Sequence, residues 1–385
     1  MRFWTRARRK TSAIVLAGVV GFAVPAGAAD RLLEEAVAFS GSILFLETGV
    51  PGLVLGAIRD GETAVAGFGE IADGTGRAPD GDTLMRVGSV TKVFTGAVLA
   101  SLAADGTVGL ADPLQKHLGA DARVAAKDGK PIRLIDLATH TSGLPRELER
   151  EPGPEKDPFA TLTLEAYRAA LAERDAQLFA AGTGGLYSNF AFDMLGVALG
   201  EAAEKPYADL LAERVLGPLG LKHTKFAPTE ADRPRLMQGH NVDGSPLPDV
   251  PATPVMAGAS SLYSTPNDIL RWLGWHLDRA SPDMAEMRLI DHAAYVERDG
   301  LSPVFGFDES GAMDAMALGW VVMRPEGNRP LILQKAGGLQ GMLVYHAFAP
   351  ARGVGVFVAI NKFDFAAAMT MTAFANDLIE QLAPR

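Results

Sequence analysis

Cysteine is absent from all 385 residues of the chain. Its absence excludes disulfides, thiol catalysis, thiolate zinc sites and a lipid anchor on an N-terminal cysteine. Positive charge is also scarce, because 36 Lys and Arg residues stand against 46 Asp and Glu residues. An acidic surface is a poor match for nucleic acid or anionic lipid. We therefore expect no nucleic-acid partner.

Several catalytic signatures are missing as well. The chain has no Gly-x-Ser-x-Gly sequence, which argues against a Ser-His-Asp hydrolase of the α/β type. Its seven histidines show neither His-x-His nor His-Glu-x-x-His spacing, which argues against a zinc hydrolase. The Gly-x-Gly at 67–69 is not followed by a helical pattern, so nucleotide binding is not supported. We expect neither a metal nor a cofactor.

A short apolar run occurs near the start of the chain. Residues 1–10 carry five positive charges, residues 11–24 are mostly apolar, and Ala26-Gly27-Ala28 offers a small-residue cleavage site. This pattern predicts a secretory signal peptide over residues 1–28, cleaved near Ala28, since the run is too short for a retained membrane anchor. The paired Arg8-Arg9 leaves a twin-arginine export route open. The mature chain, with 31 basic and 46 acidic residues, is expected outside the cytoplasm without a membrane span.

The rest of the chain predicts an α/β fold. Strand-like runs flank Asp60-Gly61, a pair typical of hairpin turns, and three more lie between residues 329 and 361 before a closing helical pattern. Between them the apolar spacing is mostly three and four, which predicts helices. We expect an α/β part from about 31–86 and 313–385, a helical part over about 87–312, and a cleft between them. The segments 145–159 and 279–312 are predicted to be irregular, the first as a surface loop.

Ser89 and Lys92 are the first candidate catalytic pair. Ser89 stands where a helix begins, so a simple interpretation is a helix cap. Lys92 lies three residues further along the same face, in a first turn where the helix dipole disfavours a cation. Desolvation and the dipole lower a lysine pKa, so the amine could take the serine proton and make a nucleophile. The chain contains this one Ser-x-x-Lys sequence.

Two further segments strengthen this hypothesis. Tyr187-Ser188-Asn189 precedes a helical pattern, and Lys335-Ala336-Gly337-Gly338 ends a predicted strand. A phenol near two ammonium groups would have a lowered pKa and could act as a second base, while an amide could bind a substrate amide. Lys335 would hold a substrate carboxylate, and the glycines would let a substrate lie along the strand. Backbone N–H groups of Ser89 and Gly338 would form the oxyanion hole. His140 is predicted to be structural, at a helix end near the cleft.

These three motifs, in this order, resemble those of the serine β-lactamase and penicillin-binding protein superfamily, class C branch. "LATHTSGLP", "GASSLYSTPNDILRWL" and "ALGWVV" resemble that branch too, and "YSNFAFDMLG" and "KPYADLLAERVLGPLGLKHT" are similar to its AmpH type. The resemblance implies an antiparallel sheet flanked by helices plus an all-helical subdomain, forming one catalytic domain over residues 29–385. It also implies a periplasmic D-alanyl-D-alanine carboxypeptidase/endopeptidase with peptidoglycan peptides and β-lactams as ligands.

The resemblance implies that Ser89 of this chain is the nucleophile and that Lys92 and Tyr187 share the roles of general acid and base. It also implies that Asn189 and Lys335 bind the substrate. One position departs from the pattern, because the third motif usually carries a hydroxyl residue where this chain has Ala336. Without that hydroxyl, a hydrogen bond to the substrate carboxylate is missing. Asn361-Lys362 could supply a replacement or form a strand-end turn.

Two rival functions remain open at this point. A carboxylesterase of the same fold would be less tuned to carboxylate substrates, as Ala336 suggests. A binding module would recognise cell-wall peptides or β-lactams without turnover, although the intact Ser-Lys-Tyr set argues against it.

Overall fold

The computed structural model describes residues 30–383, apart from residues 120, 174 and 309. The predicted signal peptide, residues 1–28, lies outside the described residues. The helices are α1 (Arg31–Thr48), α2 (Thr91–Ala104), α3 (Leu134–Ala138), α4 (Leu164–Ala172), α5 (Asn189–Ala202), α6 (Tyr207–Leu211), α7 (Pro266–Leu277), α8 (Ala285–His292) and α9 (Phe365–Leu382). Within the described part, none of them is long and apolar enough to span a membrane.

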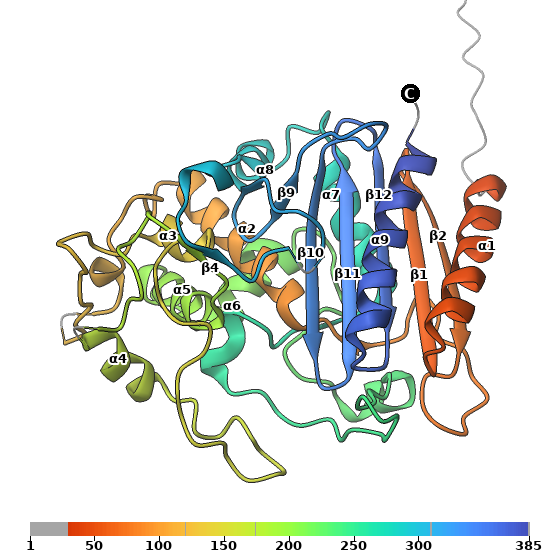
Figure 1. The fold of residues 1–385 in the computed structure, drawn as a ribbon, viewed down its shortest axis with the longest axis horizontal. Coiled ribbons are helices and arrows are strands. Elements are labelled where there is room, and N and C mark those ends of the chain that lie inside the picture. Colours follow the sequence, from red (N-terminus) through yellow and green to blue (C-terminus); the bar gives the residue numbers. More distant parts are fainter. Residues whose placement is uncertain (1–29, 120, 174, 309, 384–385) are drawn as a thin grey trace, which may run out of the picture.

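An antiparallel sheet of eight strands forms the centre of the molecule (Figure 1). Its order is β2-β1-β12-β11-β10-β9-β8-β6, so both ends of the chain contribute neighbouring strands. The strands are β1 (Gly52–Arg59), β2 (Glu62–Gly69), β6 (Val296–Glu297), β8 (Ala315–Met316), β9 (Val321–Met323), β10 (Ile332–Leu339), β11 (Met342–Ala349) and β12 (Val354–Ile360). The hairpin between β1 and β2 turns at Asp60 and Gly61, with φ of 51° and 89°, as the sequence predicts.

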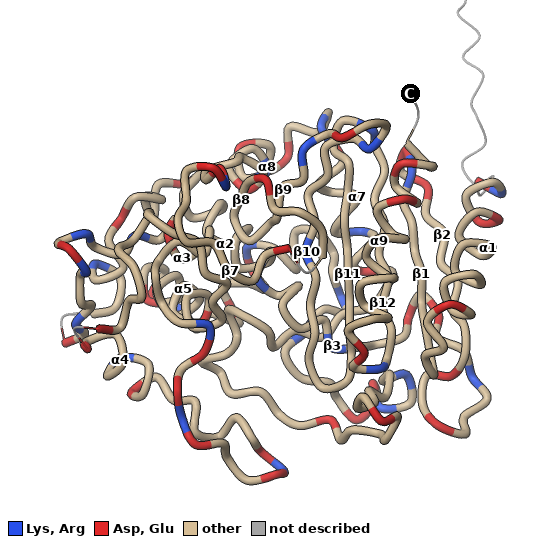
Figure 2. The backbone as a smooth tube through the Cα atoms, in the orientation of Figure 1, with Lys and Arg blue, Asp and Glu red and all other residues tan. Residues whose placement is uncertain are grey.

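Helices cover both faces of the sheet. Helices α1 and α9 pack on one face, and α7 packs on the other, behind β12 and β1 in the view of Figure 1. Strands β11 and β12 carry no charged residue, and Figure 2 shows them uniformly tan, whereas acidic and basic residues are scattered over the helices and loops. Burial on both faces explains these continuous apolar strands, because each side of the strand must contact a helix layer.

The helical part lies beside the sheet and contains α2 to α6 (Figure 1). Two short two-stranded sheets join segments that are distant in sequence. In one, β3 (Met85–Arg86) pairs with β5 (Tyr263–Ser264), and in the other, β4 (Gly185–Leu186) pairs with β7 (Val304–Phe305). The pairing of β3 with β5 places the segment leading into Ser89 against residues 263–264, which are distant along the chain.

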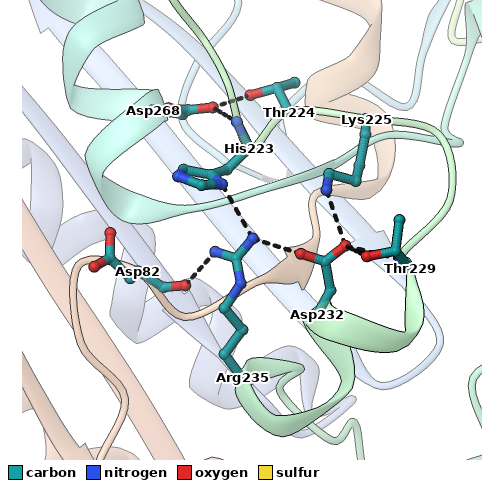
Figure 3. A network of polar contacts seen from close by, with 8 residues as sticks. All are labelled: Asp82, His223, Thr224, Lys225, Thr229, Asp232, Arg235 and Asp268. Carbon is teal, nitrogen blue, oxygen red and sulfur yellow. Dashed lines mark hydrogen bonds and ion pairs between the residues drawn. The ribbon is translucent and has the colours of Figure 1, made fainter.

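A polar network fixes the chain between α6 and α7 (Figure 3). Asp232 accepts hydrogen bonds from Lys225 at 2.9 Å and from Arg235 at 2.6 Å. Arg235 also donates to the Asp82 carbonyl at 2.8 Å, while Asp268 at the start of α7 accepts from the Thr224 hydroxyl at 2.9 Å. Since Asp232 is buried, these partners compensate its charge and hold the segment against the sheet domain.

Some local predictions were wrong. The segment 279–312 is not wholly irregular, because it contains α8 and the short strands β6 and β7. The loop 145–159 is more than a surface loop, since several of its residues line the cleft described below. Helix α1 was not predicted individually, although its residues were assigned to the α/β part.

Candidate active site

Ser89 and Lys92 lie at the start of α2. Ser89 belongs to a short 3₁₀ turn over Gly88–Val90, and Lys92 occupies the first turn of the α-helix that follows. The Lys92 Nζ lies 3.1 Å from the Ser89 Oγ. Ser89 makes no capping hydrogen bond to either helix start, so the cap interpretation is wrong. Its hydroxyl instead faces the amine.

Glycines let the turn approach strand β10 closely. Gly88 has φ of 51°, and a Cβ built on it would lie 2.7 Å from the Gly338 backbone nitrogen. A Cβ on Gly337 would lie 2.2 Å from the Val87 carbonyl oxygen. Both contacts are too short for a side chain, so these positions require glycine. The result is that the Ser89 turn and the end of β10 form one continuous wall.

Lys92 is fully buried and uses all three of its N–H donors. Besides Ser89, its Nζ donates to the Asn189 Oδ1 at 2.5 Å and to the Ala259 carbonyl at 3.0 Å. Burial, with the positive charge of Lys335, holds the pKa of Lys92 well below its usual value. If the amine loses a proton, its lone pair can face Ser89 while two N–H groups still satisfy Asn189 and Ala259. Deprotonation therefore leaves neither buried acceptor without a partner.

Tyr187 and Asn189 come from the segment before α5. Ser188 caps that helix, its Oγ accepting from the Ala191 N–H at 2.9 Å, and this orients the residues on either side. Three cations surround the Tyr187 ring: the Nζ of Lys92 at 5.0 Å, the Nζ of Lys335 at 4.9 Å and the guanidinium carbon of Arg146 at 4.9 Å from its centroid. The three cations attract the face of the ring and hold it in place in the cleft.

Lys335 to Gly338 form the last part of β10. The Lys335 Nζ donates to the Tyr187 Oη at 3.3 Å and to the Ala336 carbonyl at 2.9 Å. The structure thus brings all of the predicted residues to one cleft, lined among others by Ser89, Tyr187, Asn189, Lys335, Ala336, Gly337 and Gly338, with Lys92 buried directly behind Ser89.

His140 supports the tyrosine. Its Nδ1 accepts a hydrogen bond from the Ser188 N–H at 3.0 Å, and its ring stacks on Tyr187 with centroids 4.4 Å apart. Burial and the charges of Lys92 and Lys335 lower the pKa of His140, so it stays neutral and can accept this bond. The backbone of His140 has φ of 59°, which turns the chain from α3 toward the cleft.

Two polar residues of the cleft were missed from the sequence. Arg146 and Glu147 come from the loop 145–159, and the Glu147 carboxylate accepts a hydrogen bond from the Asn189 Nδ2. The Asn189 amide is therefore held at both ends, by Lys92 and by Glu147. The charged, proline-rich composition of that loop is typical of solvent exposure and gave no signal of a place in the cleft.

Asn361 does not take the place of the hydroxyl that position 336 lacks. Its side chain is fully buried, and its Oδ1 accepts from the Gly52 N–H at 2.7 Å. The amide therefore ties the end of β12 to the start of β1, which is the strand-end role.

An antiparallel sheet beside a helical part, with a serine and a buried lysine between them, defines a serine hydrolase of the β-lactamase/DD-peptidase fold. The Beta-lactamase family model matches residues 29–380, and the chain belongs to that family. The expected fold and family are thereby confirmed.

Individual relatives agree with this assignment. The D-alanyl-D-alanine-carboxypeptidase/endopeptidase AmpH of Escherichia coli K12 is 35% identical over 343 residues, 88% of this chain and 87% of that protein. A crystal structure of a β-lactamase/D-alanine carboxypeptidase from Yersinia pestis, complexed with citrate, has 35% identity and a TM-score of 0.82, covering 92% of this chain and 99% of that one. A class C β-lactamase structure, at 18% identity and a TM-score of 0.77 over 92% and 97% of the two chains, shows the same fold.

Proposed function

We propose that the chain is a D-alanyl-D-alanine carboxypeptidase/endopeptidase that acts on peptidoglycan peptides through an acyl-enzyme on Ser89. The observation that carries the proposal is the buried Lys92 amine, 3.1 Å from the Ser89 hydroxyl with its pKa lowered. A hydroxyl becomes an effective nucleophile when a base of this kind accepts its proton. The E. coli and Y. pestis relatives supply the substrate class.

In the acylation step, the Ser89 oxygen attacks the carbonyl of the penultimate D-Ala while its proton passes to neutral Lys92. In this proposal the oxyanion forms beside the backbone N–H groups of Ser89 and Gly338, and the close packing of the Gly88 turn on β10 supports this role. Collapse of this intermediate breaks the peptide bond, and the leaving amine takes a proton delivered through Tyr187. Water then hydrolyses the serine ester and restores the Ser89 hydroxyl.

Substrate binding would use the groups that line the same cleft. Lys335 offers a positive charge for the terminal carboxylate, and Asn189 offers its amide to the substrate backbone. A β-lactam presents a carboxylate and a strained amide in a similar arrangement, so penicillins should acylate Ser89 and be hydrolysed slowly if at all. A crosslinked peptide as leaving group would make the same chemistry an endopeptidase reaction.

We further propose that residues 29–385 form one catalytic unit which acts in the periplasm. The charge and apolar pattern of residues 1–28 support export, and so does a peptidoglycan substrate.

A carboxylesterase activity is the second candidate, favoured by one observation. Ala336 places a methyl group where a hydroxyl would assist the substrate carboxylate, and the neighbouring cleft wall includes Phe363, Phe365 and Met369. Such a wall suits an apolar ester without a carboxylate.

One experiment separates the two candidates. The purified protein is incubated with pentapeptide muropeptides and with a p-nitrophenyl ester, and the products are followed by mass spectrometry and absorbance. The proposal predicts release of free D-Ala that Ser89→Ala abolishes, while Ser101→Ala on the same helix leaves it intact. Ester cleavage without D-Ala release would replace the first candidate with the second.

A further inference from the structure

A second cluster of chemically reactive side chains lies away from the cleft. It consists of His276, next to the last residue of α7, with Asp291 and His292, the last two residues of α8. The His276 Nδ1 lies 2.6 Å from the His292 Nε2. The Asp291 Oδ2 lies 3.8 Å from the first of these atoms and 3.9 Å from the second. None of the three residues lines the catalytic cleft.

Three donor atoms this close together can hold a metal ion after a small rearrangement of the two rings, because tetrahedral zinc keeps its ligating nitrogens about 3.3 Å apart rather than 2.6 Å. Atoms 2.6, 3.8 and 3.9 Å apart define a point that is about 2 Å from all three. Zinc bonds to imidazole nitrogen and carboxylate oxygen are about 2.0 to 2.2 Å long. A hydrogen bond between the two rings explains the shortest separation, but it leaves the carboxylate beyond hydrogen-bonding distance of both rings.

The Asp291 carboxylate is the strongest sign that a partner belongs there. Its side chain is fully buried, the Oδ2 accepts from the Trp320 Nε1 at 2.9 Å, and the Oδ1 has no hydrogen-bond partner among the described residues. An ionised carboxylate buried with a single neutral donor is costly, so this group either takes up a proton or holds a cation that compensates its charge. The Trp320 N–H would then orient a ligating carboxylate, as hydrogen bonds around metal sites commonly do.

The surroundings of the cluster suit a structural ion. The His276 ring packs against Trp272 and Trp320, with centroids 4.1 and 5.0 Å away, and this aromatic shell excludes water on one side. His292 is 18% exposed, whereas His276 and Asp291 are fully buried, so ions and water can reach the cluster at His292. Two imidazoles and a carboxylate, with water in the fourth position, are a donor set that zinc accepts.

We propose that His276, Asp291 and His292 bind one divalent transition-metal ion of the zinc type. The ion joins the ends of α7 and α8 and compensates the buried Asp291 charge. It takes no part in the chemistry at Ser89, and it does not depend on the function proposed for that site. The sequence gives no metal motif here, because the spacing of His276 from Asp291-His292 matches none of the short zinc-binding patterns.

Cobalt binding tests the proposal on the purified full chain after treatment with a chelator. Bound zinc is measured by elemental mass spectrometry before the chelator treatment, and Co²⁺ is titrated after it while visible absorption is recorded. The proposal predicts one equivalent of metal per chain. In His292→Asn the Kd should rise on the order of 100-fold, since loss of a ligand should exceed the effect of losing an outer-shell partner.

His117→Asn is the matched control, because the His117 Nε2 also lies beside an aspartate, 2.8 Å from the Asp112 Oδ2. It should bind Co²⁺ as the unmodified chain does. Absence of binding, an unchanged Kd in His292→Asn, or equal losses in both variants would overturn the proposal.

A second measurement needs no variant, in case His292→Asn does not fold. Crystals of the unmodified chain grown with equimolar zinc should give an anomalous peak at the zinc edge within bonding distance of all three side chains. A map with zinc only elsewhere, or without a peak, would refute the site.

Discussion

Asp193 on α5 offers a sharp test of the electrostatics beneath the active site. Its side chain is 2% exposed, and the Tyr167 hydroxyl donates to its Oδ2 at 2.6 Å. Burial raises the pKa of this carboxyl from 3.8 to about 8 in the folded protein. Asp193→Asn keeps a similar shape and an oxygen that can accept from Tyr167, but it removes the charge.

The sign of the effect follows from the raised pKa. Folding favours the protonated carboxyl, so the stability it contributes is fully present below about pH 4 and is lost as pH rises toward 8. The loss is about 1.4 kcal/mol per pH unit over that window, or on the order of 4 kcal/mol at pH 7. Asp193→Asn escapes this loss, so its free energy of unfolding should exceed that of the unmodified chain by a similar amount at pH 7.

Urea unfolding followed by circular dichroism at pH 5, 6, 7 and 8 measures this difference. We expect the advantage of Asp193→Asn to grow steadily from pH 5 to pH 8. Asp209→Asn on the exposed surface of α6 is the control and should show no such growth. A difference that does not change with pH, or a variant less stable than the unmodified chain at pH 8, would refute the reasoning.

Three further variants test the site. Glu147→Gln removes a negative charge that favours the Lys92 ammonium, so the pKa of Lys92 should fall. The acidic limb of the plot of kcat/KM against pH should then move to lower pH, and a shift to higher pH would contradict this. Ala336→Thr restores a hydroxyl beside Lys335. Acylation by a fluorescent penicillin should become about tenfold faster, which is the effect of one hydrogen bond to a charged group. A slower reaction would exclude a role for this hydroxyl in binding the substrate carboxylate. Gly88→Ala would place a Cβ 2.7 Å from the Gly338 nitrogen, so the melting temperature and the acylation rate should both fall. An unchanged acylation rate would show that the turn tolerates a side chain.

The sequence predicted the parts of the structure that depend on short-range patterns. The Asp60-Gly61 hairpin, strands β10 to β12 and helix α9 follow from apolar periodicity and turn residues within a few positions of one another. The gathering of Ser89, Tyr187 and Lys335 was predictable because each lies in a motif whose order and chemistry are specific.

Contacts between distant segments were beyond such reasoning. Glu147 meets Asn189 only because a loop of ordinary solvent-exposed composition folds over the cleft. The cluster of His276, Asp291 and His292 depends on how the ends of α7 and α8 pack together, and neither helix carries a metal motif. The capping of α5 by Ser188 was likewise not predicted, because the residue at which a helix begins depends on the packed protein.

Acylation of Ser89 tests the central claim most directly. The protein is treated with benzylpenicillin, and its intact mass and proteolytic peptides are measured by mass spectrometry. The account predicts one penicilloyl adduct on the peptide that contains Ser89, its loss in Ser89→Ala, and a rate at least 100-fold slower in Lys92→Met, since general-base assistance contributes about 10² to 10⁴. A Ser89 that stays unmodified, or an adduct that forms equally fast without the Lys92 amine, would contradict it.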